Sequence, residues 1–116
     1  MNSGASPDNT VYGNCGQSSL YLNNLGNGNA AFLEGAQSSL GYMTYVSWTV
    51  TWDNYNDNYK GSVSGSQVIF GDNWSHTDTR KVYSGDVYIK MTNLYVVLIW
   101  GGTCTGGGAS DLEYVS

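Results

Sequence analysis

The chain has 116 residues, of which 11% are charged and 41% hydrophobic, and its formal net charge is −5. This is the length of one domain, and the composition excludes both a solvated disordered tail and a membrane protein. Ten tyrosines, four tryptophans and sixteen glycines, against one proline, favour strands and turns over helices. We therefore predict a single all-β domain.

The few basic residues exclude two classes of partner. The chain has only four of them, Lys60, Arg80, Lys81 and Lys90. Nucleic acids and anionic membrane surfaces are both bound through clusters of Lys and Arg, which one Arg-Lys pair does not provide. The most apolar run, residues 94–100, is too short to cross a bilayer as a helix, and no signal peptide precedes it. We expect neither nucleic-acid binding nor membrane insertion and, if the protein is exported, a printed sequence in its mature form.

Two cysteines, Cys15 and Cys104, lie near opposite ends of the chain in glycine-rich flanks. An even count without a Cys-x-x-Cys motif, and with a single histidine, favours a disulfide over a metal site. The alternative is a pair of unpaired thiols in a cytosolic domain. A bond closing so long a loop would contribute on the order of 4 kcal/mol. Together with the low charge, this predicts a secreted, extracellular protein.

The first third of the chain alternates between turn signals and short strands. Residues 1–10 are small and polar and predict a flexible leader, followed by one domain over residues 11–116. Short strands are expected over 11–23 and again over 29–34. An Asn- and Gly-rich turn separates them, because both residue types tolerate a positive φ.

The most informative stretch is residues 42–52, YMTYVSWTVTW. Its even positions are largely apolar and its odd positions more polar, which is the period of a half-buried strand. We predict that the even row is core and that the odd row faces outward. The even row includes Trp48 and Trp52, and we also place Trp100 in the core.

The second half contains further strands and two polar segments. Residues 67–70 predict a short buried strand, and residues 94–100, apolar on both faces, an interior strand covered on both sides. The segment after Trp52 predicts a polar hairpin, and Trp74 is expected in a polar loop that also holds His76. An edge strand is expected near the end of the chain, with Leu112 and Tyr114 on one face.

These elements add up to seven to nine short strands, which predicts an antiparallel β-sandwich. The arrangement of Trp48 on a mid-chain strand, a Gly85-x-x-Tyr88 step and a final apolar hairpin resembles an immunoglobulin-type Greek key. The resemblance implies a corner role for Tyr88. It departs from the family in the cysteines, since Cys15 and Cys104 would join the first strand to the last.

Catalytic motifs are weak in this sequence. The single imidazole is His76, no G-x-S-x-G motif occurs, and most acidic residues stand in turn contexts. Asp53, Tyr55 and Asp57 alternate as in a calcium loop, but the glycine and the glutamate that an EF-hand requires are displaced or missing. No glycine-rich phosphate loop is present. We expect no enzymatic activity, no cofactor and no metal, with a small hydrolase using an unrecognised acid pair as the least favoured alternative.

A binding function is easier to motivate, because three aromatic residues are expected in hydrophilic loops. Tyrosine and tryptophan provide rigid surfaces that stack on sugars or pack on proteins, and amides and carboxylates supply hydrogen bonds. We predict a secreted, non-catalytic recognition domain for a glycan or a cell-surface component. The alternative is an extracellular protein-interaction module, such as an adaptor subunit of a secreted assembly or toxin complex, or an inhibitor. The predicted ligand contacts are Tyr55, Tyr59, Trp74, Asn54, Asn56, Asp72 and Asn73.

Overall fold

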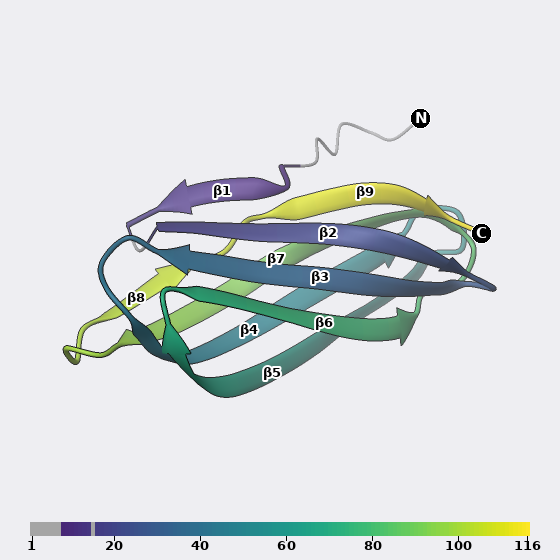
Figure 1. Ribbon diagram of the computed structural model, residues 1–116. Coiled ribbons are helices and arrows are strands. Elements are labelled where there is room, and N and C mark those ends of the chain that lie inside the picture. Colours follow the sequence, from purple (N-terminus) through teal and green to yellow (C-terminus); the bar gives the residue numbers. More distant parts are fainter. Residues whose placement is uncertain (1–7, 15) are drawn as a thin grey trace.

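The computed structural model describes residues 8–14 and 16–116, which form two antiparallel β-sheets packed face to face (Figure 1). This confirms the all-β sandwich. The part of the chain that the structure describes contains no helix, and so no helix able to cross a membrane. Its strands are β1 (Thr10–Gly13), β2 (Gly16–Gly26), β3 (Asn29–Ser38), β4 (Met43–Asn54), β5 (Tyr59–Gly71), β6 (Asn73–Lys81), β7 (Gly85–Leu98), β8 (Thr103–Gly106) and β9 (Ser110–Val115).

The two sheets differ in the order of their strands. The first sheet has the order β1-β2-β3-β6, and the second has the order β5-β4-β7-β8, with β9 also paired to β7. The chain therefore crosses between the sheets after β3, after β5 and after β6. As Figure 1 shows, these crossings place β5 and β6 along the same open side of the sandwich. Two edge strands from different sheets thus face each other there.

The central strand β4 supplies the middle of the core, as its sequence pattern predicts. Val46, Trp48, Val50 and Trp52 are all buried. The alternation changes phase near the start of the strand, because the β4–β5 pairing shifts register between Met43 and Tyr45. Met43 is therefore buried. Tyr42, which we assigned to the core row, is 47% exposed.

Two glycines on β5 make room for the large indoles of β4. Gly61 pairs with Trp52 and Gly65 pairs with Trp48. A Cβ atom added at either glycine would overlap the six-membered ring of the paired tryptophan. Each indole therefore lies flat over the backbone of the edge strand, which explains why β5 is poor in inward-facing side chains.

Three further predicted placements are wrong. Residues 67–70 belong to the edge strand β5, and Val68 and Phe70 are 80% and 70% exposed, because nothing in the described part of the chain covers their face. Trp74 lies on β6 instead of in a loop, and it is buried. Trp100 is 64% exposed, because β7 ends at Leu98, where hydrogen bonds to residues 101 and 102 close a tight turn.

Residues 8–10, at the start of the described chain, already make contacts with the sandwich. The backbone carbonyl of Asp8 accepts a 2.8 Å hydrogen bond from Ser110, and the side chain of Asn9 donates to the carbonyls of Leu20 and Ser110. Residues 8–10 therefore belong to the sandwich, whereas residues 1–7 lie outside the described residues. Cys15 is also outside them, so the disulfide stays a prediction. The predicted partner, Cys104, is buried on β8.

Candidate functional sites

The predicted ligand contacts do not form one surface. Tyr55 and Tyr59 lie at the β4–β5 turn, whereas Asp72 lies in the β5–β6 turn and Asn73 begins β6. The whole length of β5, about 40 Å for an extended strand of this size, separates the two turns. The molecule is 45 Å long, so the two groups lie at opposite ends. Trp74 is buried between the sheets and joins neither group.

Two of the predicted amide contacts hold turns together. The side-chain nitrogen of Asn54 lies within 3.2 Å of the backbone carbonyls of residues 82, 83 and 84, and its oxygen accepts from the amides of Asn56 and Asp57. The side-chain oxygen of Asn56 accepts from the amide of Asp86. Since Asn54 is fully buried, its described contacts fix the β4–β5 turn against the β6–β7 turn.

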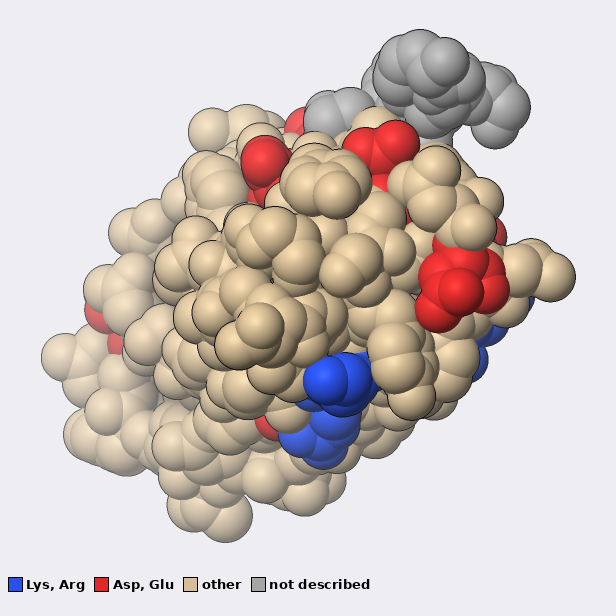
Figure 2. Space-filling model, turned by 90° about the vertical axis from the view of Figure 1, so that its right-hand side faces the viewer, with Lys and Arg blue, Asp and Glu red and all other residues tan. Residues whose placement is uncertain are grey.

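The end of the sandwich near these turns carries a cluster of tyrosines, which we call the tyrosine end: Tyr55, Tyr59, Tyr83 and Tyr88. The rings of Tyr59 and Tyr83 meet edge to face at 4.8 Å, and those of Tyr55 and Tyr88 lie nearly parallel at 6.4 Å. Lys81 lies over the ring of Tyr83. Figure 2 views this end of the molecule, where a group of basic side chains lies near the middle of the face and acidic side chains are also present.

The sequence missed the contribution of Tyr83, which follows β6 in a connecting segment. Its φ is 65°, a conformation that is uncommon for residues other than glycine and asparagine. Asn54 accounts for this backbone, since it binds the carbonyl of Tyr83 and those on either side. Burial raises the pKa of Tyr55, and the negative charge of Asp53 adds to the effect.

A shallow depression of about 550 Å³ lies beside the tyrosine end, on the outer face of the second sheet. Tyr88 provides its aromatic wall, with hydroxyl, carboxylate and ammonium groups around it. Lys60 and Asp53 lie 4.0 Å apart within it. Its lining residues are Thr51, Trp52, Asp53, Lys60, Gly61, Ser62, Tyr88 and Lys90.

The opposite end of the sandwich is apolar. We call it the apolar end, and it consists of six exposed hydrophobic residues from β5 and from the β3–β4 and β7–β8 connections. Among residues 38–42, 67–73 and 98–102, which build this end, the single charged residue is Asp72. Large exposed apolar patches are uncommon on monomeric proteins and mark interaction sites. Its members are Leu40, Tyr42, Val68, Phe70, Ile99 and Trp100.

Contacts within the apolar end hold its shape. The indole nitrogen of Trp100 donates to the carbonyl of Leu40 at 2.9 Å, and the amide of Ile99 donates to the carbonyl of Tyr42 at 2.8 Å. The rings of Tyr42 and Phe70 meet edge to face at 5.2 Å. The connections are thus tied to each other before any partner arrives, so little conformational entropy would be lost on binding.

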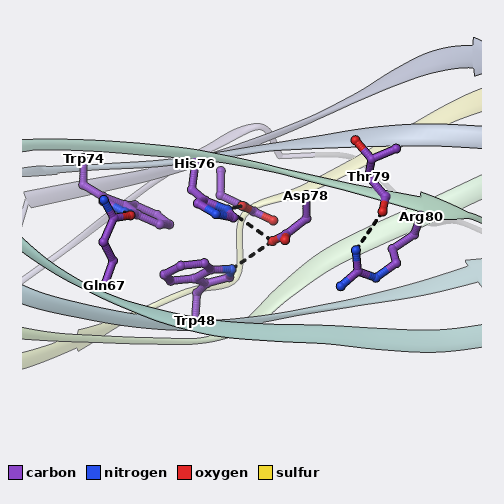
Figure 3. Close-up of polar contacts among 8 residues, drawn as sticks. Trp48, Gln67, Trp74, His76, Asp78, Thr79 and Arg80 are labelled. Atoms are coloured by element: carbon purple, nitrogen blue, oxygen red, sulfur yellow. Dashed lines mark hydrogen bonds and ion pairs between the residues drawn. The ribbon is translucent and has the colours of Figure 1, made fainter.

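A polar cluster lies between the sheets on the open side of the sandwich, where β3 and β6 meet β4 (Figure 3). Glu34 on β3 pairs directly with His76 on β6, and Asp78 follows two residues later on the same face of β6. The Nδ1 atom of His76 lies 3.1 Å from Oε1 of Glu34 and 3.4 Å from Oδ2 of Asp78. A histidine and two carboxylates therefore converge, of which the sequence predicted only His76 as a candidate for chemistry.

Two tryptophans enclose this cluster. The ring of Trp48 lies 4.6 Å from that of His76 and 4.8 Å from that of Trp74. The indole nitrogen of Trp48 donates to Oδ2 of Asp78, and that of Trp74 donates to the side chain of Gln67, both at 3.1 Å. In Figure 3 the indole of Trp48 extends beneath His76 and points its nitrogen at Asp78. Stacking and hydrogen bonding together restrict the orientation of His76 and Asp78.

Glu34 has the most perturbed environment of the cluster. Its side chain is fully buried, and its Oε2 atom has no hydrogen-bond partner among the described residues. Burial raises its pKa from 4.5 to about 9, helped by the neighbouring Asp78 carboxylate, while Arg80 acts in the opposite direction. In the absence of a cation, the Glu34 carboxyl therefore keeps its proton at neutral pH.

No protein-family model, curated protein or solved structure matches this chain. The candidate functional sites are the tyrosine end, the apolar end and the polar cluster around His76.

Proposed function

We propose that this protein is a secreted, non-catalytic recognition domain that binds a glycan in the depression beside the tyrosine end. The observation that carries the proposal is the lining of this depression. It combines an aromatic wall at Tyr88 with the hydroxyls of Thr51 and Ser62 and with the charged groups of Lys60 and Lys90. Sugars present both C–H faces and hydroxyl groups, so they need stacking and hydrogen bonding on the same surface.

The neighbouring tyrosines extend this surface. Tyr55 lies parallel to Tyr88, and with Tyr59 it is more than one-third exposed. Tyr55 and Tyr59 keep the role expected of them from the sequence, whereas Asp72, Asn73 and Trp74 lie too far along the strands, or too deep between the sheets, to join it. The proposed site thus contains fewer of the seven residues that the sequence predicted as ligand contacts.

A glycan array probed with the purified chain tests this proposal. We expect selective binding that Tyr88→Ala weakens at least tenfold, because the main stacking surface is lost. Tyr12→Ala is the matched control, since Tyr12 is 79% exposed but lies on β1, away from the depression. An empty array, or equal binding by the wild type and Tyr88→Ala, would contradict the proposal.

A second candidate function rests on the apolar end. Leu40, Val68 and Ile99 are aliphatic and offer no hydrogen bonds to a sugar, but they suit a hydrophobic surface on another protein. Phe70 and Trp100, exposed by 70% and 64%, would be the central anchors. This supports the alternative of an extracellular protein-interaction module, such as an adaptor subunit or inhibitor.

The double variant Phe70→Ser, Trp100→Ser separates the two candidates. If the apolar end is the functional surface, a stoichiometric partner recovered from culture medium with the wild type should be lost with this variant and retained with Tyr88→Ala. If the glycan site is the functional surface, the two variants should behave in the opposite way on the array. A partner retained by the double variant would contradict the protein-interaction candidate.

The strand order supports an immunoglobulin-like Greek key as the finer description of the fold. In that family the chain forms a pair of neighbouring strands in one sheet and then crosses to the other sheet. After the second crossing, the next strand pairs with a strand of the first pair. Here β6 returns beside β3 and β7 returns beside β4. This pattern, common among extracellular domains, agrees with the proposed secretion.

The Cys15–Cys104 disulfide is part of the same proposal. Gly13 and Gly16, which precede and follow the segment containing Cys15, line one cavity together with Thr105 and Gly106. Thr105 directly follows Cys104. The neighbours of both cysteines in the sequence therefore lie close together, as a bond between the cysteines requires.

A further inference from the structure

We propose that Glu34, His76 and Asp78 form a binding site for a divalent transition-metal ion, with Zn²⁺ as the preferred ion. One ligand atom from each residue lies within 4.8 Å of the other two. The site is built on paired strands, so its ligands are fixed by the register of β3 and β6. This site is independent of the proposed glycan site.

The distances fit a metal ion. Zinc bonds to nitrogen and oxygen ligands are about 2.0 to 2.2 Å long, so two ligands of a tetrahedral zinc ion lie about 3.3 to 3.5 Å apart. The Nδ1 atom of His76 lies 3.1 Å from the Glu34 oxygen and 3.4 Å from the Asp78 oxygen. All three ligand atoms lie within 4.8 Å of one another, so a closer approach of the two carboxylates would place them in one coordination sphere.

The polar atoms of the cluster do not satisfy all of one another's hydrogen-bonding groups. The Nδ1 atom of His76 faces two carboxylates but can donate at most one proton. The Oε2 atom of Glu34, on a side chain with no exposed surface, has no partner among the described residues. Buried polar atoms without partners are uncommon and call for an explanation. A cation between the three ligands would interact with all of them and would compensate the charge of the buried Glu34 carboxylate.

The surroundings of the cluster favour a transition metal over calcium or magnesium. An imidazole ligand suits zinc and its neighbours in the transition series, whereas calcium and magnesium prefer oxygen ligands alone. The indole nitrogen of Trp48 holds Oδ2 of Asp78, as outer hydrogen bonds do in known metal sites. Arg80 is the nearby group whose positive charge opposes metal binding.

The site has an open side. The side chain of His76 is 35% exposed and that of Asp78 is 14% exposed, whereas Glu34 is closed off from solvent. The ion would therefore enter from the edge between β5 and β6. Three protein ligands leave the fourth position of a tetrahedral ion for water or for an external ligand.

Isothermal titration of the metal-free, untagged full chain with ZnCl₂ tests the proposal. We expect one ion per chain, bound at micromolar Zn²⁺ or below, with a change in tryptophan fluorescence because Trp48 contacts both His76 and Asp78. Glu34→Gln and His76→Gln should each weaken binding about 100-fold, while millimolar Mg²⁺ should produce no change.

Matched variants keep the test decisive. Glu34→Gln preserves the shape of the side chain, and thermal unfolding verifies that the variant is folded. Asp72→Asn removes an acidic group from a distant turn and should leave the zinc affinity unchanged. Absence of binding at micromolar Zn²⁺, or equal binding by the wild type and Glu34→Gln, would overturn the proposal and leave a hydrogen-bonded cluster without a metal.

Discussion

Replacing Glu34 by glutamine should remove most of the pH dependence of stability of the metal-free protein. The pKa of this carboxyl rises from 4.5 in the unfolded chain to about 9 in the folded state. Between these values the folded protein holds a proton that the unfolded chain releases, so the free energy of unfolding falls as the pH rises. Between the two pKa values, each pH unit lowers the free energy of unfolding by about 1.4 kcal/mol. At neutral pH the protein has therefore lost about 3 kcal/mol relative to acidic pH.

Urea unfolding in the presence of a chelator measures this effect. From about pH 5 to about pH 8, the wild-type protein should lose about 4 kcal/mol of unfolding free energy through Glu34. Glu34→Gln should lack this contribution and should be the more stable of the two at the higher pH. Asp72→Asn, which changes an exposed acid, should keep the wild-type slope. Parallel pH profiles for the wild type and Glu34→Gln would refute the assignment of a buried, protonated Glu34.

Three further predictions test the fold. Asn54→Ala should lower the unfolding free energy by about 3 kcal/mol in urea titrations, because it removes a fully buried side chain that holds three backbone carbonyls, whereas exposed Asn23→Ala should have little effect. Phe32→Ala should cost about 3 to 5 kcal/mol, since Phe32 is fully buried between the sheets; a smaller loss would mean that the core repacks. Mass spectrometry of the secreted protein should give an intact mass two hydrogen atoms below that of the reduced form, and two free thiols would contradict the Cys15–Cys104 bond.

The sequence predicted the sandwich because its central strand carries a strong pattern. Alternation over residues 42–52 identified the core row correctly from Val46 to Trp52. It failed at Tyr42, since a bulge shifts the phase and alternation alone does not reveal bulges. The pattern of residues 94–100 likewise extended past the end of β7, because the glycines at 101 and 102 determine where the chain turns.

The strand β6 could not be recognised from its residues. Its inward row reads Trp74, His76, Asp78 and Arg80, which is polar apart from the tryptophan and therefore resembles a loop. At Glu34 the sequence shows an ordinary strand pattern, which gives no indication that the carboxylate is buried. Only the pairing of β3 with β6 brings Glu34 and His76 together, and they are far apart in the sequence. Long-range pairing of this kind leaves no local signal.

The candidate ligand residues show the same limit. The sequence correctly placed Tyr55 and Tyr59 near a polar turn, but it gave no means of measuring their distance from Asp72. The length of β5 separates them, and the β6–β7 connection supplies Tyr83 in their place. The sequence therefore grouped polar and aromatic residues from two distant turns into one site. It missed Tyr83, which lies beside Tyr59 but comes from a segment without a distinctive pattern.

The glycines beneath the two indoles of β4 have a consequence for divergence. Because Gly61 lies against Trp52 and Gly65 against Trp48, a mutation that adds a side chain at either position is tolerable only after the facing indole has become smaller. The two positions of each pair should therefore change together in related chains, small opposite large. Trp48 also contacts His76 and Asp78, so replacement of the Gly65–Trp48 pair would alter the polar cluster as well. Substitutions at the Gly61–Trp52 pair would leave these contacts unchanged.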